Sequence, residues 1–466
     1  MRVLSNNGYK IVKSEFPIET IKQIRDELTV KPKTFQKNKR NETKFCVFLE
    51  SPKKLYIPRF FGLKMFGEPD EDKMKPGDPI QVTFNGSLRE EQKPIEDIYL
   101  KNARESGGGI ISLRCGGGKT VLALHIICQL KVKTIVVVHK DFLMTQWRDR
   151  ILEFIPDAKI GKVQEKTIDI EGKDIVLAMV QSLSTKEYEE GTFDSFGLAV
   201  FDECHHLGAE VFQRSMGKVS SKYMLGLSAT PKRKDGLSKV FEWSIGPIVY
   251  KQAVKNEDYA EVQLIPFECE DPLYNKIELN YMREPCLPKM INNICNYLPR
   301  TDMIIQLIYQ YHQEGRTVLI LSDRREHLNT IYKLLEGVTK GFYVGGMKPE
   351  QLRESQTKRV LLATFSMASE GMDIPSLDTV ILSSPKSDVE QSVGRVFRKK
   401  ACDRTFHPLI VDIQDNFSSF ERQGTKRITF YKKMNFTLFK DGKEVPKRAK
   451  KTKKVEEIQD FCLIDD

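Results

Sequence analysis

Long hydrophobic runs are missing from this sequence. No apolar stretch approaches the roughly 20 residues that a membrane-spanning helix requires, and the N-terminal segment MRVLSNNGYKIVKSEFP lacks the hydrophobic region of a signal peptide. We therefore expect a soluble, intracellular protein without membrane contact. In a eukaryotic or viral setting, the expected compartments are the nucleus, the virion or a viral factory.

Closely spaced cysteine pairs are missing too. The chain has nine cysteines in 466 residues, none of them in a CxxC pair, and an odd number does not suit a full set of disulfides. This pattern argues against a zinc ribbon and against a disulfide framework. We therefore expect reduced thiols.

A strong charge of one sign is absent as well. Lysine and arginine number 74 against 64 acidic residues, which leaves a formal net charge of +10. That modest excess is compatible with a polyanionic partner, but surplus lysine on a solvated surface gives the same balance. With 40% hydrophobic and 30% charged residues the composition is that of a folded protein, and the length predicts two or three domains.

Short apolar runs that alternate with helical periods dominate the chain after residue 79. Near-continuous apolar strands separated by helices are typical of parallel sheets that are buried on both faces. The first series reads IISL, TIVVVH, IVLAMV, LAVFD and MLGLSA, and the second reads TVLILS, FYVGG, RVLLATF, TVILSS and LIVDI. Two series predict two α/β domains, at 79–255 and 256–425, with the boundary where the pattern weakens and prolines occur.

The flanking segments differ from this pattern. Residues 1–78 predict a small α/β domain, with a helix at 17–28, strands in FCVFLE and KLYIPRFFGL, and a polar linker at 68–79. The aromatic and basic stretch at 56–66 suits base stacking, although a place in the domain core is favoured. Residues 426–466 form a C-terminal extension whose basic run PKRAKKTKK predicts a disordered tail, with nucleic-acid affinity, localisation or solubility as its role.

A glycine-rich turn lies between an apolar strand and a helical segment in LRCGGGKT. Residues without a Cβ let backbone amides converge on phosphate oxygens, and a helix N-terminus adds partial positive charge. Lys119 is placed to reach the outer phosphates of a nucleotide and Thr120 to bind Mg²⁺. Leu113 replaces the first glycine of the P-loop pattern, so a plain glycine turn is the alternative. The expected phosphate-binding residues are Cys115, Gly116, Gly117, Gly118, Lys119 and Thr120.

An acidic pair ends a later apolar strand, in LAVFDECHH. A solvated acidic pair at a strand end is common, but the joint occurrence of Asp202 and Glu203 with the glycine loop favours a P-loop site. In such a site the first acid holds Mg²⁺ and the second polarises the attacking water. His205 and His206 lack metal-ligand spacing to other His or Cys residues, so zinc is not expected.

Around DECH the sequence resembles the superfamily 2 nucleic-acid helicases and translocases, and further motifs follow in that family's order. They are LREEQ at 88–92, VVVHKDFLMTQW at 136–147, LAMVQSL at 177–183, LGLSATP at 225–231, VLILSDRREH at 318–327, LLATFSMASEGMDIP at 361–375 and QSVGRVFRK at 391–399. Within the superfamily the chain is most similar to the DNA-directed branch of XPB-like, UvsW-like and large-DNA-virus helicases. The resemblance implies two RecA-like parallel-sheet domains in tandem behind the small N-terminal α/β domain.

The resemblance also implies roles for the residues that match its motifs. Glu203 is the implied general base, and Arg395 and Arg398 are implied to meet the γ-phosphate, to which a guanidinium offers a planar, permanently charged fork. The remaining implied roles are adenine recognition by Gln92, metal binding by Asp202, a nucleotide-facing acid at Asp373 and a polar coupling across the cleft by His205 and Gln391. The implied contacts with a nucleic-acid backbone are His139, Lys140, Gln146, Gln181, Ser182, Arg324, Thr364 and Ser366.

The implied activity is that of an ATP-dependent helicase or translocase, monomeric, with ATP and Mg²⁺ as cofactors. DNA is favoured over RNA as the nucleic-acid partner, and the implied processes are repair, recombination or transcript release, in which transcription or repair proteins are further partners. Two alternatives stay open from the sequence. One is the same motor acting on RNA, and the other is a catalytically inactive scaffold that binds nucleic acid.

Overall fold

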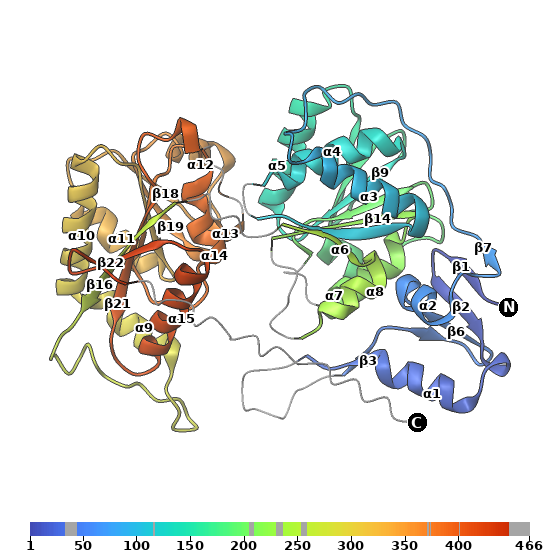
Figure 1. The fold of residues 1–466 in the computed structure, drawn as a ribbon, viewed down its shortest axis with the longest axis horizontal. Coiled ribbons are helices and arrows are strands. Elements are labelled where there is room, and N and C mark those ends of the chain that lie inside the picture. The colour runs from blue at the N-terminus through green and yellow to red at the C-terminus, as the bar shows by residue number, and fades with distance from the viewer. Residues whose placement is uncertain are drawn as a thin grey trace, which may run out of the picture. The chain divides into compact units, whose positions relative to one another are not determined.

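The chain folds into two compact units in the computed structural model (Figure 1). The structure describes residues 1–32, 44–114, 117–204, 209–229, 236–252, 259–370, 372, 374–399 and 401–446. The first unit comprises the described residues up to 252 together with 366–370 and 372, and the second comprises those of 259–365 and 374–446. No helix in these ranges is long and apolar enough to cross a membrane.

A small sheet begins the first unit, with its strands in the order β5-β6-β2-β1-β7. Tyr9 and Ile11 are buried on one face of this sheet, where Ile21 and Ile24 of the predicted amphipathic helix also lie. The elements are β1 (Val3–Ser5), β2 (Gly8–Val12), α1 (Ile18–Glu27), β3 (Thr29–Val30), β4 (Phe45–Cys46), β5 (Leu49–Glu50), β6 (Lys54–Ile57), α2 (Arg59–Phe66) and β7 (Glu71–Asp72).

Two segments of this region differ from the sequence-based expectation. The stretch KLYIPRFFGL was predicted as a strand, but it divides at Pro58 into β6 and the helix α2. Proline fits a helix start because its missing N–H is not needed there, and Phe61 of α2 packs edge-on against Trp243 at 5.6 Å. The polar segment predicted as a linker contains β7, which pairs in parallel with β1. The 56–66 stretch therefore contributes to the core of the first unit, which is the interpretation that was favoured over base stacking.

The larger sheet of the first unit has eight strands within residues 108–251, in the order β11-β10-β12-β9-β13-β14-β8-β15. Its neighbouring strands pair in parallel except β10 and β11. The strands are β8 (Gly108–Ser112), β9 (Thr134–Val138), β10 (Ile160–Gln164), β11 (Thr167–Asp169), β12 (Ile175–Met179), β13 (Leu198–Phe201), β14 (Tyr223–Ser228) and β15 (Ile248–Lys251).

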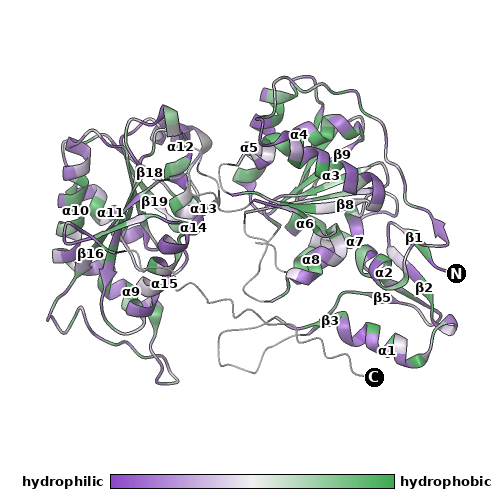
Figure 2. Ribbon diagram, in the orientation of Figure 1, coloured by the Kyte–Doolittle hydropathy of each residue, from purple (hydrophilic) through white to green (hydrophobic). Residues whose placement is uncertain are grey.

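Helices cover both faces of this sheet, and Figure 2 shows its hydrophobic strands between them. Alternate residues of one strand point to opposite faces, so Val136 packs with α3, α4 and α5 while Val137 packs with α6, α7 and α8. The small N-terminal sheet shares the second of these cores. The helices are α3 (Lys93–Ser106), α4 (Lys119–Leu130), α5 (Asp141–Phe154), α6 (Val180–Thr185), α7 (Ala209–Val219) and α8 (Ser238–Ile245).

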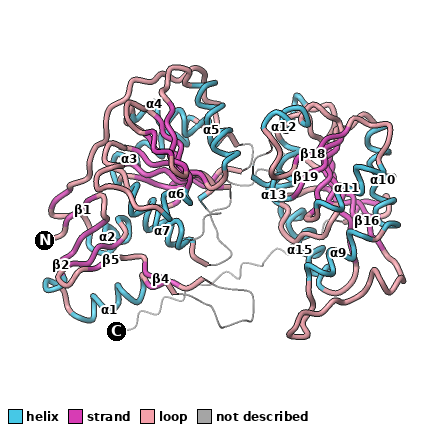
Figure 3. The backbone as a smooth tube through the Cα atoms, turned by 180° about the vertical axis from the view of Figure 1, so that it is seen from behind, coloured by secondary structure: helices cyan, strands magenta, loops and turns pink. Residues whose placement is uncertain are grey.

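The second unit contains another eight-stranded sheet among its described residues, in the order β18-β19-β17-β20-β21-β16-β22-β23. Only the terminal β22–β23 pair is antiparallel, and Figure 3 shows helices on both sides of these strands. The sheet includes β22 and β23, which follow the boundary predicted at residue 425. The strands are β16 (Glu261–Phe267), β17 (Val318–Ser322), β18 (Lys340–Tyr343), β19 (Val360–Thr364), β20 (Thr379–Leu382), β21 (Leu409–Asp415), β22 (Thr437–Lys440) and β23 (Lys443–Glu444). The helices are α9 (Leu287–Asn296), α10 (Leu298–Gln313), α11 (Arg325–Leu334), α12 (Pro349–Ser355), α13 (Phe365–Glu370), α14 (Glu390–Val393) and α15 (Ser419–Lys433).

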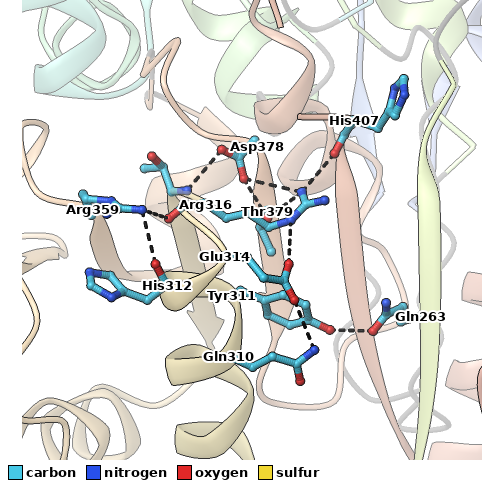
Figure 4. Close-up of polar contacts among 11 residues, drawn as sticks. Gln263, Gln310, Tyr311, His312, Glu314, Arg316, Arg359, Asp378, Thr379 and His407 are labelled. Carbon is cyan, nitrogen blue, oxygen red and sulfur yellow. Dashed lines mark hydrogen bonds and ion pairs between the residues drawn. The ribbon is translucent and has the colours of Figure 1, made fainter. Parts of the chain in front are cut away.

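A polar network joins the amino-terminal ends of the strands in this second sheet (Figure 4). The Arg316 guanidinium, just before β17, donates to the carbonyl of His407 at 3.1 Å, and the Asp378 carboxylate accepts the Thr317 amide at 3.1 Å. Arg359, just before β19, donates to the Arg316 carbonyl at 3.2 Å. These bonds connect the amino-terminal ends of the strands to one another and stabilise the fold there. They lie at the edge of the sheet opposite the carboxyl ends of the strands, where ligands bind in folds of this kind.

Candidate nucleotide site and nucleic-acid face

The carboxyl ends of parallel strands gather the predicted residues of the first unit at one edge of its sheet. Gln181 follows β12, His139 follows β9, Asp202 follows β13, and the glycine loop follows β8. These strands run in parallel and lie near one another in the sheet. In open α/β sheets, ligands bind in the crevice outside this edge.

The glycine loop is held by the side chain of Gln92. The Gln92 amide donates to the carbonyls of Gly117 and Gly118 at 3.2 Å each, and its oxygen accepts the Arg89 amide at 3.1 Å. Gly118 has φ +73°, and a Cβ on it would lie 2.5 Å from the Gln92 amide nitrogen. Only glycine combines this backbone conformation with so close an approach. The loop then passes directly into α4 at Lys119.

Lys119 forms an ion pair with the second residue of the acidic pair. The Lys119 ammonium donates to Oε1 of Glu203 at 2.5 Å, and both side chains are largely buried, at 11% and 15% exposure. Glu203 has φ +44°, a backbone conformation that is unfavourable for a residue with a Cβ. The structure thus brings the loop lysine and the predicted general base together.

Asp202 is buried and is held by a tryptophan from the neighbouring helix. The Trp147 indole N–H of α5 donates to Oδ2 of Asp202 at 2.8 Å, and the Glu203 amide donates to Oδ1 at 2.9 Å. Burial raises the pKa of Asp202, and the charge of Glu203 adds to this, whereas the Lys119 charge and the Trp147 hydrogen bond lower it. Trp147 lies within a helicase-like motif, but the motif predicted no role for it. The available signal was that a buried tryptophan N–H needs a polar partner.

The donor set suits a magnesium ion that is held mainly by a nucleotide. Asp202 offers a carboxylate with lone pairs beyond the two hydrogen bonds, and Thr120 is the second residue of α4. Within the described ranges, no three His, Cys, Asp or Glu side chains gather as a metal cage. Mg²⁺ requires no such cage, because it keeps several waters and binds through one or two protein oxygens plus phosphates.

The predicted nucleic-acid contacts of the first unit lie at the same edge. The Gln181 side chain donates to the His139 carbonyl at 3.0 Å, which links the segments after β12 and β9. Lys140 is the N-cap of α5, the helix that also carries Gln146. Ser182 is buried, and its hydroxyl accepts the Glu165 amide at 2.9 Å. The structure therefore links His139 and Gln181 by a hydrogen bond, whereas Ser182 is buried.

The second unit places its predicted residues after the carboxyl ends of three adjacent strands. Arg324 follows β17 and caps α11, with its guanidinium donating to Oδ1 of Asn292 at 2.5 Å and to the Pro288 carbonyl at 2.9 Å. Thr364 ends β19, and Ser366 lies in α13, in the short segment that groups with the first unit. The residues after β20 are Gln391 in α14, Arg395 in the 3₁₀ turn Gly394–Phe397, and Arg398 directly after that turn.

Two buried arginines, which the sequence analysis missed, hold the segment between β20 and α14. The Arg300 guanidinium pairs with Asp415 at 2.8 and 3.0 Å and donates to the Ser383 carbonyl at 2.6 Å. Arg427 pairs with Asp412 at 2.8 Å and donates to the Lys386 carbonyl at 2.7 Å. Neither arginine lies in a helicase-like motif, and only their burial in the fold reveals them.

Four predicted site residues lie outside the described residues. They are Cys115, Gly116, His205 and Asp373. Their predicted roles stay predictions.

Two family models match the chain. The model described as "Type III restriction enzyme, res subunit" matches residues 85–233, and "Helicase conserved C-terminal domain" matches residues 299–400. The first range contains the glycine loop and the acidic pair, and the second contains the motifs of the second sheet.

Relatives from large DNA viruses share most of the chain. A protein of Acanthamoeba polyphaga mimivirus, provisionally named ATP-dependent RNA helicase L396, is 36% identical over 93% of this chain and 85% of its own length. A protein of African swine fever virus, provisionally named ATP-dependent RNA helicase QP509L, is 24% identical over 75% of this chain and 73% of its own length. Among solved structures, "The crystal structure of T4 UvsW" covers 91% of this chain and 96% of that one, at 17% identity and a TM-score of 0.39.

The chain therefore belongs to the superfamily 2 helicases, in the branch that includes helicases of large DNA viruses. Its fold of two parallel sheets, each covered by helices, is that of the tandem RecA-like helicase domains. As a member of this family the protein is an ATP-dependent helicase enzyme, which confirms the predicted family, fold class and enzyme type.

Proposed function

We propose that this helicase is a DNA-directed motor whose first unit binds MgATP at the glycine loop. The observation that carries the proposal is the convergence of Lys119, Asp202 and Glu203 at one edge of the sheet, beside the helix that carries Gln146. The candidate nucleotide-binding residues and the candidate nucleic-acid contacts of this unit thus lie on the same elements, β9, α5 and β13.

The Lys119–Glu203 ion pair supports a specific order of events in hydrolysis. A triphosphate entering the loop competes with the Glu203 carboxylate for the Lys119 ammonium, because both ligands are anions and the ammonium is compact. Lys119 then holds the outer phosphates, and the released carboxylate of Glu203 accepts the proton of the attacking water. Asp202 and Thr120 would hold Mg²⁺, which neutralises charge on the phosphates. In this scheme Arg395 and Arg398 of the second unit stabilise the charge that develops on the γ-phosphate.

The preference for DNA rests on the similarity of DECHH and GLSATPKRKDG to the DNA-directed branch. Contacts to a phosphodiester backbone carry little base specificity, so these contacts do not select the sugar. Repair, recombination and transcript release are the processes that this preference favours.

The same motor acting on RNA is the second candidate, because the mimivirus and African swine fever virus relatives carry RNA helicase in their names. Measuring ATP hydrolysis with single-stranded DNA, duplex DNA and RNA separates the two. We expect the largest stimulation with DNA. Strong stimulation by RNA alone would contradict the DNA preference.

A further inference from the structure

The helix α15 of the second unit has a strongly basic outer face. Its inner face is buried, with buried residues recurring every three or four positions at Phe420, Gly424, Arg427 and Tyr431. The exposed cations of the helix, here called the basic face, are Arg422, Lys426, Lys432 and Lys433. Arg422, Lys426 and Lys433 are four and seven residues apart, so they form one row about 16 Å long.

The basic face lacks partners of opposite charge within the described part of the chain. None of its four side chains takes part in an ion pair there, and no position three or four residues away holds a carboxylate. Lys433 lies near Glu390 of α14, on which its charge acts. Exposed helix cations elsewhere are paired, as Arg214 of α7 is with Glu210 at 2.7 Å. The charge of the other three residues of the basic face is therefore available to a ligand.

Helix stability explains only half of the basic face. Lys432 and Lys433 lie in the last turn, where the helix dipole favours cations. Arg422 is the fourth residue of α15, in the turn where the same dipole disfavours a cation. Arg422 and Lys426 also repel each other, because like charges four residues apart are neighbours on a helix. A negatively charged ligand gives these two residues a role that the helix by itself does not.

The helix α15 borders the elements that carry the candidate contacts of this unit (Figure 1). Its second residue, Phe420, belongs to the same hydrophobic cluster as the buried side of α9, and Arg324 donates to the Asn292 side chain of α9 at 2.5 Å. On the inner face, Arg427 donates to the Lys386 carbonyl in the segment between β20 and α14. The basic face thus lies on a helix that is fixed to the same elements.

We propose that the basic face of α15 binds the phosphodiester backbone of a nucleic acid, with Arg422 and Lys426 each neutralising one phosphate. This inference goes beyond the proposed function, since it needs neither the ATP site nor the preference for DNA. A row of about 16 Å spans roughly five phosphates along one strand of a duplex. Backbone contacts of this kind do not depend on base sequence, and nucleic acid is the polyanion on which a helicase acts.

The test measures the affinity of the full chain for labelled single-stranded DNA, duplex DNA and RNA at several salt concentrations, without ATP. Each phosphate contact contributes about 0.7 to the slope of log affinity against log salt on single strands and about 0.9 on duplex DNA. Combining Arg422→Gln with Lys426→Gln should therefore reduce that slope by about 1.4 and 1.8, respectively. At 0.1 M salt this corresponds to about 25-fold weaker binding to single strands. Both positions are exposed, and glutamine is a good helix former, so the fold should persist.

Two controls separate local charge from other effects. Exchanging the cations, Arg422→Lys with Lys426→Arg, keeps both charges and should bind like the wild type. Arg214→Gln with Lys358→Gln removes the same charge from two cations that are paired with acids at 2.7 and 3.1 Å, and should leave the slope unchanged. The basic C-terminal tail is present in every variant, so it does not contribute to the difference.

Each outcome decides the inference. A wild-type slope and affinity in the double glutamine variant would overturn it and leave the proposed motor function intact, because ATP hydrolysis is measured separately. Weaker binding without a change in slope would assign α15 a purely structural role and overturn it as well. The same holds if the charge-exchanged variant binds as weakly as the glutamine variant. Lost binding to polyglutamate with unchanged binding to polynucleotides would assign the basic face to an acidic protein instead.

Discussion

Replacing Trp147 by phenylalanine removes one N–H group from the candidate metal site and leaves an aromatic ring in place. The indole N–H donates to a buried carboxylate at 2.8 Å, and a hydrogen bond to a charged group contributes about 1.5–3 kcal/mol to stability. We expect Trp147→Phe to lower the free energy of unfolding by this amount at neutral pH, in addition to a packing loss from the smaller ring.

The sign of the pH dependence follows from the charge of Asp202. Its pKa is raised in the folded state, chiefly by burial, so its ionised form costs stability above the unfolded pKa of about 3.9. The substitution removes a contact that lowers this pKa, so the pKa rises further and the cost grows at neutral pH. As the pH falls through the folded pKa, Asp202 is protonated and the extra cost shrinks, whereas the packing loss does not change.

Urea denaturation at neutral and at mildly acidic pH measures this difference. The chain has two tryptophans, and Trp243→Phe is the matched control because Trp243 packs against Phe61 and away from Asp202. Its effect on the unfolding free energy should be the same at both pH values. An equal destabilisation by Trp147→Phe at both pH values would refute the reasoning. In the active enzyme, Trp147→Phe should also raise the Mg²⁺ concentration needed for half-maximal ATP hydrolysis.

Four further substitutions test the site, one of them also in combination with a second change. Lys119→Ala should weaken nucleotide binding, measured with a fluorescent ATP analogue. Glu203→Gln should bind nucleotide but hydrolyse it about 10²- to 10⁴-fold more slowly. Hydrolysis at the wild-type rate by Glu203→Gln would refute the assignment of Glu203 as the general base. Arg398→Ala should lower stimulated ATP hydrolysis by about 10³- to 10⁵-fold with nearly unchanged affinity for nucleic acid, and a loss of that affinity instead would place Arg398 on the strand. Gly118→Ala should abolish nucleotide binding and destabilise the loop by about 1–2 kcal/mol. Adding Gln92→Ala removes the clash with the new Cβ but not the unfavourable positive φ, so the double variant should recover only part of the lost stability.

The two parallel sheets could be predicted because their strands are apolar along their whole length. This pattern is visible in each strand segment by itself and does not depend on residues far along the chain. It did not predict β7, a polar pair of residues that becomes a strand only by pairing with β1. The motifs predicted one phosphate site for both Lys119 and Glu203, so their proximity was expected, although the ion pair between them was not. Trp147 was missed for the opposite reason, because its contact with Asp202 depends on how α5 packs against β13.

The arginines of the last helicase motif depend on residues that no motif contains. In the proposed scheme Arg398 contacts the γ-phosphate, which requires the segment from β20 to α14 to be held in a single conformation within the second unit. Arg300 and Arg427 provide this, because each is buried, paired with a carboxylate of β21, and bonded to a carbonyl of residues 383–386. Removing one partner of such a pair costs about 3–5 kcal/mol, so the segment cannot leave this position cheaply. Arg427 lies in α15, beyond the boundary predicted at residue 425, and the motor's second unit therefore requires the helix that the sequence pattern assigned to an extension.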